Sequence, residues 1–324
     1  MAFKLHISRT WRLAIFASLS GALMAFALGI YVCFSPAQLA PYLLYHGNKC
    51  RDYGTVPLTY GKVTGRQMYI PAEGGGRMAA YYFENKKAAY IVLLSHGQGR
   101  MNYHVGLAKC AIASGMSAFI YEYRGFGMSS GSPSTGGMMQ DGLTAYDYLV
   151  NKLGYKPEQI IDMGSSLGTG VAANLALERK CAAVVLISPY TSINRVVYDY
   201  APFFKIYPES LFPQPKLSCL PLFESDSNTP VLLLHGEKDQ MINIKNSREL
   251  YNKACALPSE TQEPSSKISM QCRFVEYPGK MHNLSLDDIG RDLKILLADL
   301  DAGKSKSALN QSRRSQKNPD VPSI

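Results

Sequence analysis

The sequence lacks the patterns that mark several classes of binding protein. Seven cysteines are present, but there is no C-x-x-C pair and no Cys/His cluster with zinc spacing, so a structural metal site is not expected. No basic stripe interleaved with aromatic residues occurs, which argues against nucleic-acid binding. The net charge of +9 does not contradict this, because most of it comes from the two ends of the chain.

The odd number of cysteines excludes complete pairing within the chain. Cys255 and Cys272 flank a polar insertion, residues 255–272, and would be able to form a disulfide in an oxidising compartment. Cys110 and Cys181 are instead expected to be small buried apolar side chains.

Charge is absent from residues 13–34, LAIFASLSGALMAFALGIYVCF. As a helix this run would be about 33 Å long, which is enough to cross the hydrocarbon core of a membrane. A cleaved signal peptide has an apolar run of only about 7–15 residues and small residues at its cleavage site. Because this run is longer and ends in the bulky Tyr31, Val32 and Phe34, the sequence predicts an uncleaved signal anchor. A cleaved signal peptide is the alternative.

The cations around the apolar run predict its orientation. Lys4, Arg9 and Arg12 precede it and favour a cytoplasmic N-terminus, residues 1–12. The body would then face the periplasm, or the lumen or exterior in a eukaryote. Lys49 and Arg51 follow the run and weaken this prediction.

The rest of the chain divides into a juxtamembrane connector, residues 35–65, a body, residues 66–300, and a basic tail, residues 301–324, that is expected to be disordered. In the body, strand patterns alternate with helix patterns. The strands are expected at residues 77–84, 88–96, 116–123, 159–163, 182–189, 230–236 and 272–278, with the first two as neighbours. Helices are expected at residues 103–115, 138–154, 167–180 and 284–300. This alternation predicts an α/β fold with a mainly parallel sheet and helices on both faces.

Two stretches fit the pattern G-x-S-x-G, one at Ser166 and one at Ser129. A serine nucleophile in this pattern lies on a sharp turn between a buried strand and a helix. Ser166 has the strand QIIDM before it and a helical run after it, so it is the predicted nucleophile. Ser129 is followed by Gly131 and Pro133 with no helix, and it is interpreted as a loop serine. Ser165 is a weaker alternative.

A serine hydroxyl needs a base, and the base needs an acid to hold it. The chain has only six histidines: His6, His46, His96, His104, His235 and His282. His282 lies in the loop between the last strand and the last helix, which makes it the predicted base. Asp239 follows the preceding strand and is the predicted acid, with Glu237 as its local competitor.

The developing oxyanion needs hydrogen-bond donors. The backbone N–H of Leu167 follows the nucleophile, and the N–H of Gln98 lies in the glycine-rich loop LLSHGQGR after an earlier strand. Both are predicted to form the oxyanion hole. His96 is expected to orient this loop, and a substrate contact is its alternative role.

The motifs HGQG, YRGFGMSSGSPS, GSSLG, SPYTS, LLLHGEKD and PGKMHN occur in this order over residues 65–300. Together they resemble an α/β-hydrolase and, more narrowly, the BEM46-like group, whose relatives include the membrane-attached ABHD13 and ABHD17 hydrolases. The resemblance implies a serine hydrolase with Ser166, Asp239 and His282 as its triad. It also implies esterase, thioesterase or depalmitoylase activity. The sequence departs from the relatives at Ser165, where many carry a charged or larger residue, and at the insertion 255–272.

The segment 189–228 would cover the site and is rich in aromatic residues. Core packing is one interpretation, and an apolar acyl-binding wall with Tyr190, Phe203 and Phe204, beside Gly99 of the oxyanion loop, is the other. The expected activity is hydrolysis of a small-molecule, acyl-lipid or acyl-protein ester without a cofactor, by a protein that contacts the membrane through residues 13–34. A serine aminopeptidase and an inactive, membrane-tethered binding module are the alternatives.

Overall fold

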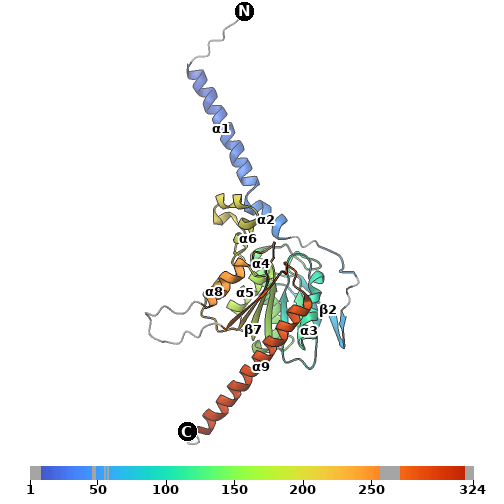
Figure 1. The fold of residues 1–324 in the computed structure, drawn as a ribbon. Coiled ribbons are helices and arrows are strands. Elements are labelled where there is room, and N and C mark those ends of the chain that lie inside the picture. The colour runs from blue at the N-terminus through green and yellow to red at the C-terminus, as the bar shows by residue number, and fades with distance from the viewer. Residues whose placement is uncertain (1–8, 46–48, 55, 57, 256–270, 318–324) are drawn as a thin grey trace, which may run out of the picture.

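The computed structural model describes residues 9–45, 49–54, 56, 58–255 and 271–317 of the chain (Figure 1). Within these residues the body is built on a nine-stranded sheet with the strand order β1-β2-β3-β5-β4-β6-β7-β8-β9. The first three pairings are antiparallel and the remaining five are parallel. The predicted mainly parallel α/β fold is confirmed.

The strands are short, and several are completely buried. Their bounds are β1 Thr59–Tyr60, β2 Val63–Pro71, β3 Arg77–Phe83, β4 Ile91–Ser95, β5 Ser117–Tyr121, β6 Ile160–Ser165, β7 Ala183–Ile187, β8 Val231–Gly236 and β9 Cys272–Tyr277. Every residue of β4, β5, β7 and β8 is buried. Strands of this kind are continuous apolar runs because helices cover both faces of the sheet.

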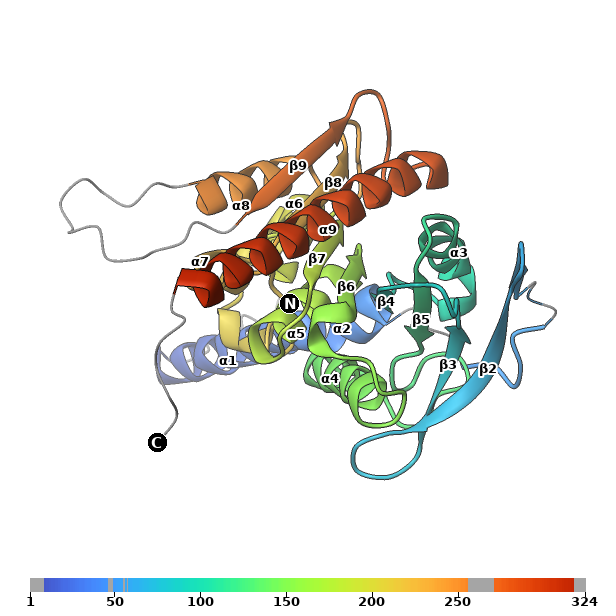
Figure 2. The ribbon, with the colours of Figure 1, turned by 90° about the horizontal axis from the view of Figure 1, so that it is seen from below.

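The α-helices precede, connect and follow these strands. Their bounds are α1 Arg9–Cys33, α2 Pro36–Leu44, α3 Val105–Ala113, α4 Thr135–Asn151, α5 Gly168–Glu178, α6 Ile193–Tyr200, α7 Leu220–Glu224, α8 Lys245–Cys255 and α9 Leu286–Lys317. Short 3₁₀ turns lie at η1 Met101–His104, η2 Pro157–Gln159, η3 Pro202–Ile206 and η4 Glu209–Leu211. Helices α3 and α9 pack on one face of the sheet, and α4, α5, α7 and α8 pack on the other (Figure 2).

Three expectations from the sequence need correction. Strands β3 and β4 are not neighbours, because the chain between them crosses over and β5 pairs with both. Strand β2 falls partly in the predicted connector, where its mixed, half-exposed residues hide the strand pattern. Residues 301–317 of the predicted disordered tail continue α9 as helix. Residues 318–324 lie outside the described residues.

Helix α1 projects away from the body at the end where α2 and α6 lie, and the far end of α9 lies on the opposite side (Figure 1). Within the described residues, α1 is the one helix long and apolar enough to cross a membrane. Its most apolar 18 residues have a mean hydropathy of 2.1, and none of them is buried. All seven cysteines are free thiols, so Cys255 and Cys272 are not joined; Cys110 is buried and Cys181 is partly buried. The insertion between Cys255 and Cys272 lies outside the described residues, apart from its ends.

Asp162 of β6 is fully buried, and neither of its carboxyl oxygens has a hydrogen-bond partner among the described residues. Burial raises its pKa well above the usual value. Because the folded-state pKa is raised, the carboxyl penalises folding increasingly as pH rises above the pKa of the unfolded state.

We therefore expect Asp162→Val, which has a similar shape, to increase the free energy of unfolding at pH 8 by about 1–3 kcal/mol. The gain should be smaller at pH 5. Melting temperatures in detergent at the two pH values test this, and Asp162→Asn separates the loss of charge from the loss of polarity. A variant that is less stable at both pH values would contradict the prediction.

Candidate active site

Ser166 lies between β6 and α5, at the carboxyl end of β6. Its φ of 51° is in the left-handed region that residues with a side chain rarely adopt. Hydrogen bonds hold this turn, since the Ser166 N–H donates to the Ile187 carbonyl at 2.8 Å and the Ser166 carbonyl accepts from the Thr169 N–H at 3.0 Å. A strained turn of this type presents a serine hydroxyl above the sheet.

The glycines on either side of Ser166 are required by close backbone contacts. A Cβ atom on Gly168 would lie 2.1 Å from the carbonyl oxygen of Ser95 in β4. A Cβ atom on Gly164 would lie 2.6 Å from the carbonyl oxygen of Gly168. The two glycines of the G-x-S-x-G pattern are therefore needed because α5 packs so closely against the strands beside it.

The structure brings Ser166, His282 and Asp239 together. His282 Nε2 lies 3.0 Å from Ser166 Oγ, and His282 Nδ1 lies 2.7 Å from Asp239 Oδ2. Because a carboxylate only accepts, Nδ1 carries the proton in this pair, and Nε2 is free to accept from the serine hydroxyl. His282 lies 43 positions after Asp239 and 116 positions after Ser166 in the sequence. The sheet nevertheless places all three residues at its carboxyl edge.

Asp239 is held ionised by several donors. Its burial alone would raise the pKa of the carboxyl, but hydrogen bonds from His235 and His282 and from the Ile242 N–H lower the pKa below the usual value. Oδ1 accepts from the backbone N–H groups of Met241 at 2.8 Å and Ile242 at 2.9 Å. Both oxygens are therefore fixed, which fixes the imidazole of His282 in turn. The competitor Glu237 accepts instead from the N–H of Gly279 at 2.8 Å.

The second serine motif is structural. Ser129 is buried, and its Oγ accepts from the Ala79 N–H at 3.0 Å and donates to the Glu122 carbonyl at 2.8 Å. These contacts tie the loop after β5 to β3. They agree with the interpretation of Ser129 as a loop serine.

The loop that carries Gln98 is supported from below by a buried polar cluster. His96 Nε2 lies 3.0 Å from Glu122 Oε1, and the hydroxyl of Tyr53 donates to Glu122 Oε2 at 2.7 Å. Both His96 and Glu122 are fully buried. The His96 Nδ1–H donates to the Gly97 carbonyl at 2.7 Å, as expected of a residue that orients this loop.

A cavity of about 490 Å³ opens beside Ser166. Most of its lining is apolar and comes from α2, from α6 with η3, and from the loop after β8. The lining residues are Leu39, Leu44, Gln98, Ser166, Leu167, Tyr190, Ile193, Val196, Val197, Tyr200, Ala201, Phe203, Phe204, Met241 and Ile242. The volume is in the range of about 300–1,000 Å³ that is typical of small-molecule sites.

Some aromatic residues of the segment 189–228 line the cavity, and others pack into the core, so each of the two interpretations describes part of the segment. Tyr190, Phe203 and Phe204 line the cavity, whereas Tyr207 and Phe212 pack into a neighbouring core cluster. Gly99 is not among the described residues that line the cavity. It adopts φ 94°, and the ring of Tyr103 lies 3.2 Å from where its Cβ would be, so a side chain at this position would be strained.

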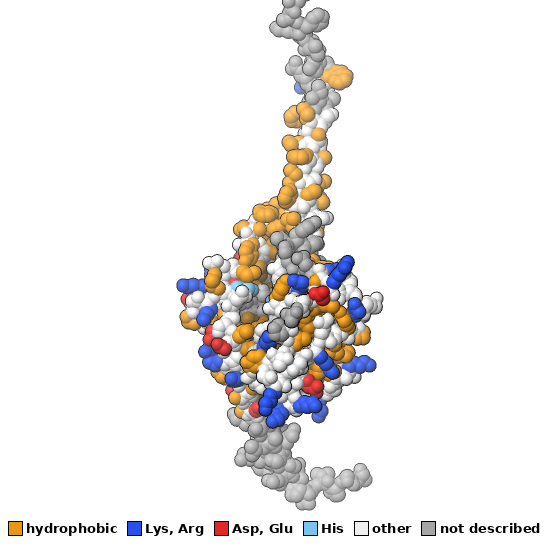
Figure 3. All heavy atoms as spheres, turned by 90° about the vertical axis from the view of Figure 1, so that its right-hand side faces the viewer, with side chains coloured by type: hydrophobic (Ala, Val, Ile, Leu, Met, Phe, Trp, Pro, Cys, Tyr) orange, Lys and Arg blue, Asp and Glu red, His pale blue; other side chains and the backbone are white. Residues whose placement is uncertain are grey.

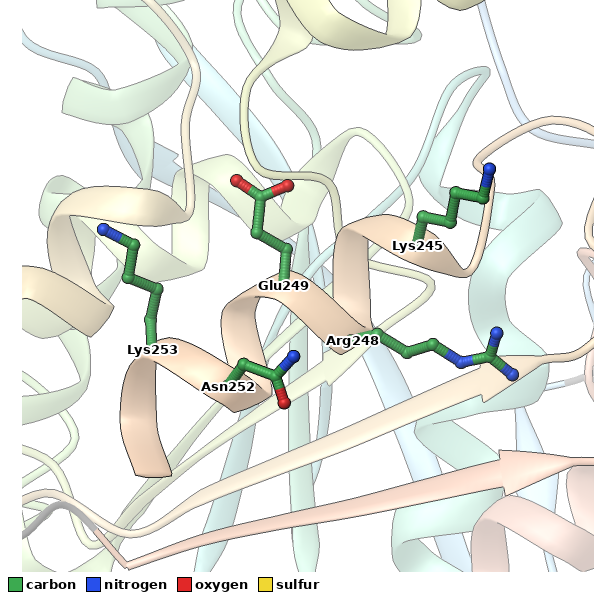
Figure 4. Close-up of a pocket in the computed structure, with 5 residues that line it drawn as sticks. All are labelled: Lys245, Arg248, Glu249, Asn252 and Lys253. Carbon is green, nitrogen blue, oxygen red and sulfur yellow. The ribbon is translucent and has the colours of Figure 1, made fainter. Parts of the chain in front are cut away.

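A second hollow, of about 400 Å³, lies on the surface of α8 and is lined by Lys245, Arg248, Glu249, Asn252 and Lys253. Figure 4 shows that these five side chains spread outward from a single helix. Arg248 is already paired with Glu276 at 2.7 Å, and Lys253 with Glu224 at 3.2 Å. None of the five residues is a serine, cysteine or histidine, so the cavity beside Ser166 is the candidate active site.

Known proteins resemble this chain in sequence and in structure. The family model described as serine aminopeptidase, S33, matches residues 86–219. Human α/β-hydrolase domain-containing protein 17B is 32% identical over 193 residues, which cover 57% of this chain and 62% of that protein. Lysophosphatidylserine lipase ABHD12 of Danio rerio is 32% identical over 244 residues, which cover 66% of this chain and 62% of the lipase.

Among solved structures, an α/β-hydrolase from Vibrio vulnificus has a TM-score of 0.59 at 20% identity, covering 75% of this chain and 88% of that one. An esterase from Pyrococcus furiosus has a TM-score of 0.59 at 16% identity, covering 79% and 97%. The chain belongs to the α/β-hydrolase superfamily. The resemblance noted in the sequence is thereby confirmed at the level of the superfamily. The chain spans less than two thirds of the length of the two curated relatives named above.

In this α/β-hydrolase, three residues near the site were missed by reasoning from the sequence. Ser188, at the end of β7, has φ 51° and its Oγ donates to the His282 carbonyl at 3.4 Å. His235 Nε2 lies 3.2 Å from Asp239 Oδ2. Burial and the nearby His96 lower the pKa of His104 to about 4, and its Nε2–H donates to the Gln98 carbonyl at 3.1 Å.

The sequence carried only a weak signal for these residues. His235 precedes a glycine at the end of a strand, as His96 does, and this shared position was the one clue to a role near the carboxyl edge. Ser188 begins the motif SPYTS, but its contact with His282 lies 94 positions away in the chain and is not visible in the motif. His104 gives no motif of its own, although its partner Gln98 lies only six residues before it.

Proposed function

We propose that the protein is a membrane-anchored serine hydrolase that cleaves carboxylic esters or thioesters of acyl groups. The observation that carries the proposal is the relay from Ser166 Oγ through His282 to Asp239, with distances of 3.0 and 2.7 Å, at the edge of an apolar cavity. A bonded nucleophile, base and acid at these distances support acyl transfer. The lipase and esterase names of the similar proteins agree with this activity.

In the proposed mechanism, Ser166 Oγ attacks the carbonyl carbon of the substrate while His282 Nε2 takes the hydroxyl proton. Asp239 stabilises the imidazolium. The N–H groups of Leu167 and Gln98 donate to the oxyanion, and His282 returns the proton to the leaving alcohol or thiol. Water, activated in the same way by His282, then hydrolyses the acyl-enzyme and restores Ser166. The residues present need no cofactor for these steps.

We further propose that α1 anchors the protein as a single-pass signal anchor. The length of α1 and the absence of charge from its residues 13–33 support a membrane span, and the cations ahead of that run support a cytoplasmic N-terminus. The hydrolase body would then lie in the periplasm, or in the lumen or exterior in a eukaryote.

The peptidase alternative takes its support from the name of the matching family model. An aminopeptidase needs an anion to hold the amine of its substrate. None of the described residues that line the cavity is acidic, so an acyl chain suits this wall better than a charged amine. An ester and amide pair with the same acyl group would separate the two activities.

Acyl-chain length tests the proposed substrate class. We expect nitrophenyl octanoate or decanoate to be hydrolysed with a kcat/KM at least about tenfold above that of the acetate, because the lining of the cavity is apolar. Val197→Trp should fill the cavity and reduce the rate with the long esters about tenfold, while leaving the acetate within about threefold. Rates that favour acetate in the wild type would overturn the acyl-chain assignment.

A further inference from the structure

The mouth of the cavity is formed by apolar residues that are also exposed to the surroundings. Tyr200, Phe203 and Met241 line the cavity, and about half or more of each is exposed; for Phe203 the fraction is 54%. The Tyr200 hydroxyl donates to the Gln240 carbonyl at 3.2 Å, which joins the end of α6 to the loop that carries Met241. An aromatic rim therefore connects the interior of the site to the outside.

This rim lies next to the base of α1. Tyr31, in the last turn of α1, stacks on Tyr207 just beyond η3, with ring centroids 4.4 Å apart. Leu39 of α2, which follows α1 after two residues, lines the cavity itself. Figure 1 shows α2 and α6 together where α1 meets the body. The membrane segment and the wall of the site are thus parts of one packed unit.

The surface around η3 is apolar and carries a suitable charge for a lipid headgroup region. Ile206 is 66% exposed, and Phe203 stacks on the buried Phe204 with centroids 4.4 Å apart. Lys205, between Phe204 and Ile206 in the sequence, is exposed and brings a positive charge to this surface. The next carboxylate along the chain, Glu209, is paired with Lys216. Apolar side chains extend from α1 onto the adjoining end of the body (Figure 3).

An exposed aromatic and aliphatic surface of this kind is unfavourable in water and favourable at the boundary between headgroups and acyl chains. Since α1 would leave the bilayer a few residues from this surface, the bilayer is the partner that is already in place. A soluble protein partner would have to displace lipid from beside α1.

We infer that η3, with Phe203 and Ile206, sits in the membrane interface beside α1, so that the cavity opens toward the bilayer and receives the acyl chain of a membrane-resident lipid without its passing through water. This rests on the proposed function for the hydrolytic step, but the membrane contact itself does not. Ser166 would then meet the ester of a lipid whose chain enters between Phe203 and Met241.

Fluorescence quenching tests the membrane contact directly. Trp11 is the one tryptophan of the chain, so Trp11→Phe gives a background for single probes. In full-length protein reconstituted in phosphatidylcholine vesicles, lipids brominated on the acyl chain should quench a Phe203→Trp probe about twofold or more. Leu177→Trp is the matched control, because Leu177 is 41% exposed at the end of α5 that points away from Ser166. Equal, weak quenching at both positions would overturn the inference.

A rate measurement tests the route of the substrate. Ile206 does not line the cavity, so Ile206→Asp should leave hydrolysis of a water-soluble butyrate ester unchanged. It should slow hydrolysis of a long-chain ester embedded in vesicles about tenfold, because a carboxylate resists entry into the interface. Ile295→Asp, at a site of 42% exposure on α9, should change neither rate. Equal rates on the embedded ester in all three proteins would overturn the proposed route.

The two tests separate the inference from the proposed function. If the wild type hydrolyses neither ester, the proposed function fails, while the quenching result still decides whether η3 contacts lipid.

Discussion

Replacing Ser166 with alanine is expected to reduce kcat by about 10⁴- to 10⁶-fold, because the attacking oxygen is lost and only binding and oxyanion stabilisation remain. KM should change little, since the hydroxyl contributes little to the apolar contacts of the cavity. Labelling by a fluorophosphonate probe, which reacts with activated serines, should disappear at the same time. Stopped assays with a long-chain nitrophenyl ester and gel fluorescence of the labelled protein measure both effects.

The chain supplies its own matched control in the second G-x-S-x-G motif. Ser129→Ala removes a buried hydroxyl that bonds Ala79 and Glu122, so it should reduce stability by about 1–2 kcal/mol but leave labelling intact. Ser165→Ala tests the adjacent hydroxyl in the same way. Persistent labelling of Ser166→Ala, or loss of labelling in a folded Ser129→Ala protein, would contradict the assignment of the nucleophile.

Asp239→Asn is expected to reduce kcat about 10³- to 10⁴-fold at neutral pH without unfolding the protein. The side chain keeps its shape, but it no longer carries the charge that stabilises the His282 imidazolium. Its amide group also donates where the carboxylate accepted, which favours the wrong tautomer of the imidazole. Steady-state rates between pH 6 and pH 10 measure the effect, and circular dichroism checks the fold.

Glu237→Gln is the control for this prediction, because Glu237 lies two residues from Asp239 and its carboxylate accepts from the Gly279 N–H rather than from His282. Its kcat should stay within about threefold of the wild type. A comparable loss of kcat in both variants would mean that Asp239 is not the specific partner of His282.

Local pattern was enough to locate the elements of the relay. The strand before Ser166 and the helix after it are short-range features, and the order of serine, acid and base follows from the strands that carry them. Ser166, Asp239 and His282 were therefore identified by their positions after β6, β8 and β9. Their mutual distances became visible only in the folded chain.

Other features depend on contacts that no local pattern encodes. The placement of β5 between β3 and β4 depends on how the crossovers pack, so the order of neighbouring strands was wrong at that point. Phe203 and Phe204 are adjacent in sequence, yet one is exposed and the other buried, because η3 turns only one of them toward Tyr207 and Phe212. The Glu122 cluster below the oxyanion loop joins three separate segments and has no sequence signature.

The stacking of Tyr31 on Tyr207 also affects how a soluble version of the enzyme would behave. A shortened chain that begins at residue 36 would keep all three members of the relay but would remove Tyr31, the ring that stacks on Tyr207. The segment over the cavity would then lose one of its supports, independently of any loss of lipid. A difference in turnover between the shortened and the full chain would therefore reflect the weaker packing of the segment over the cavity as well as the missing bilayer.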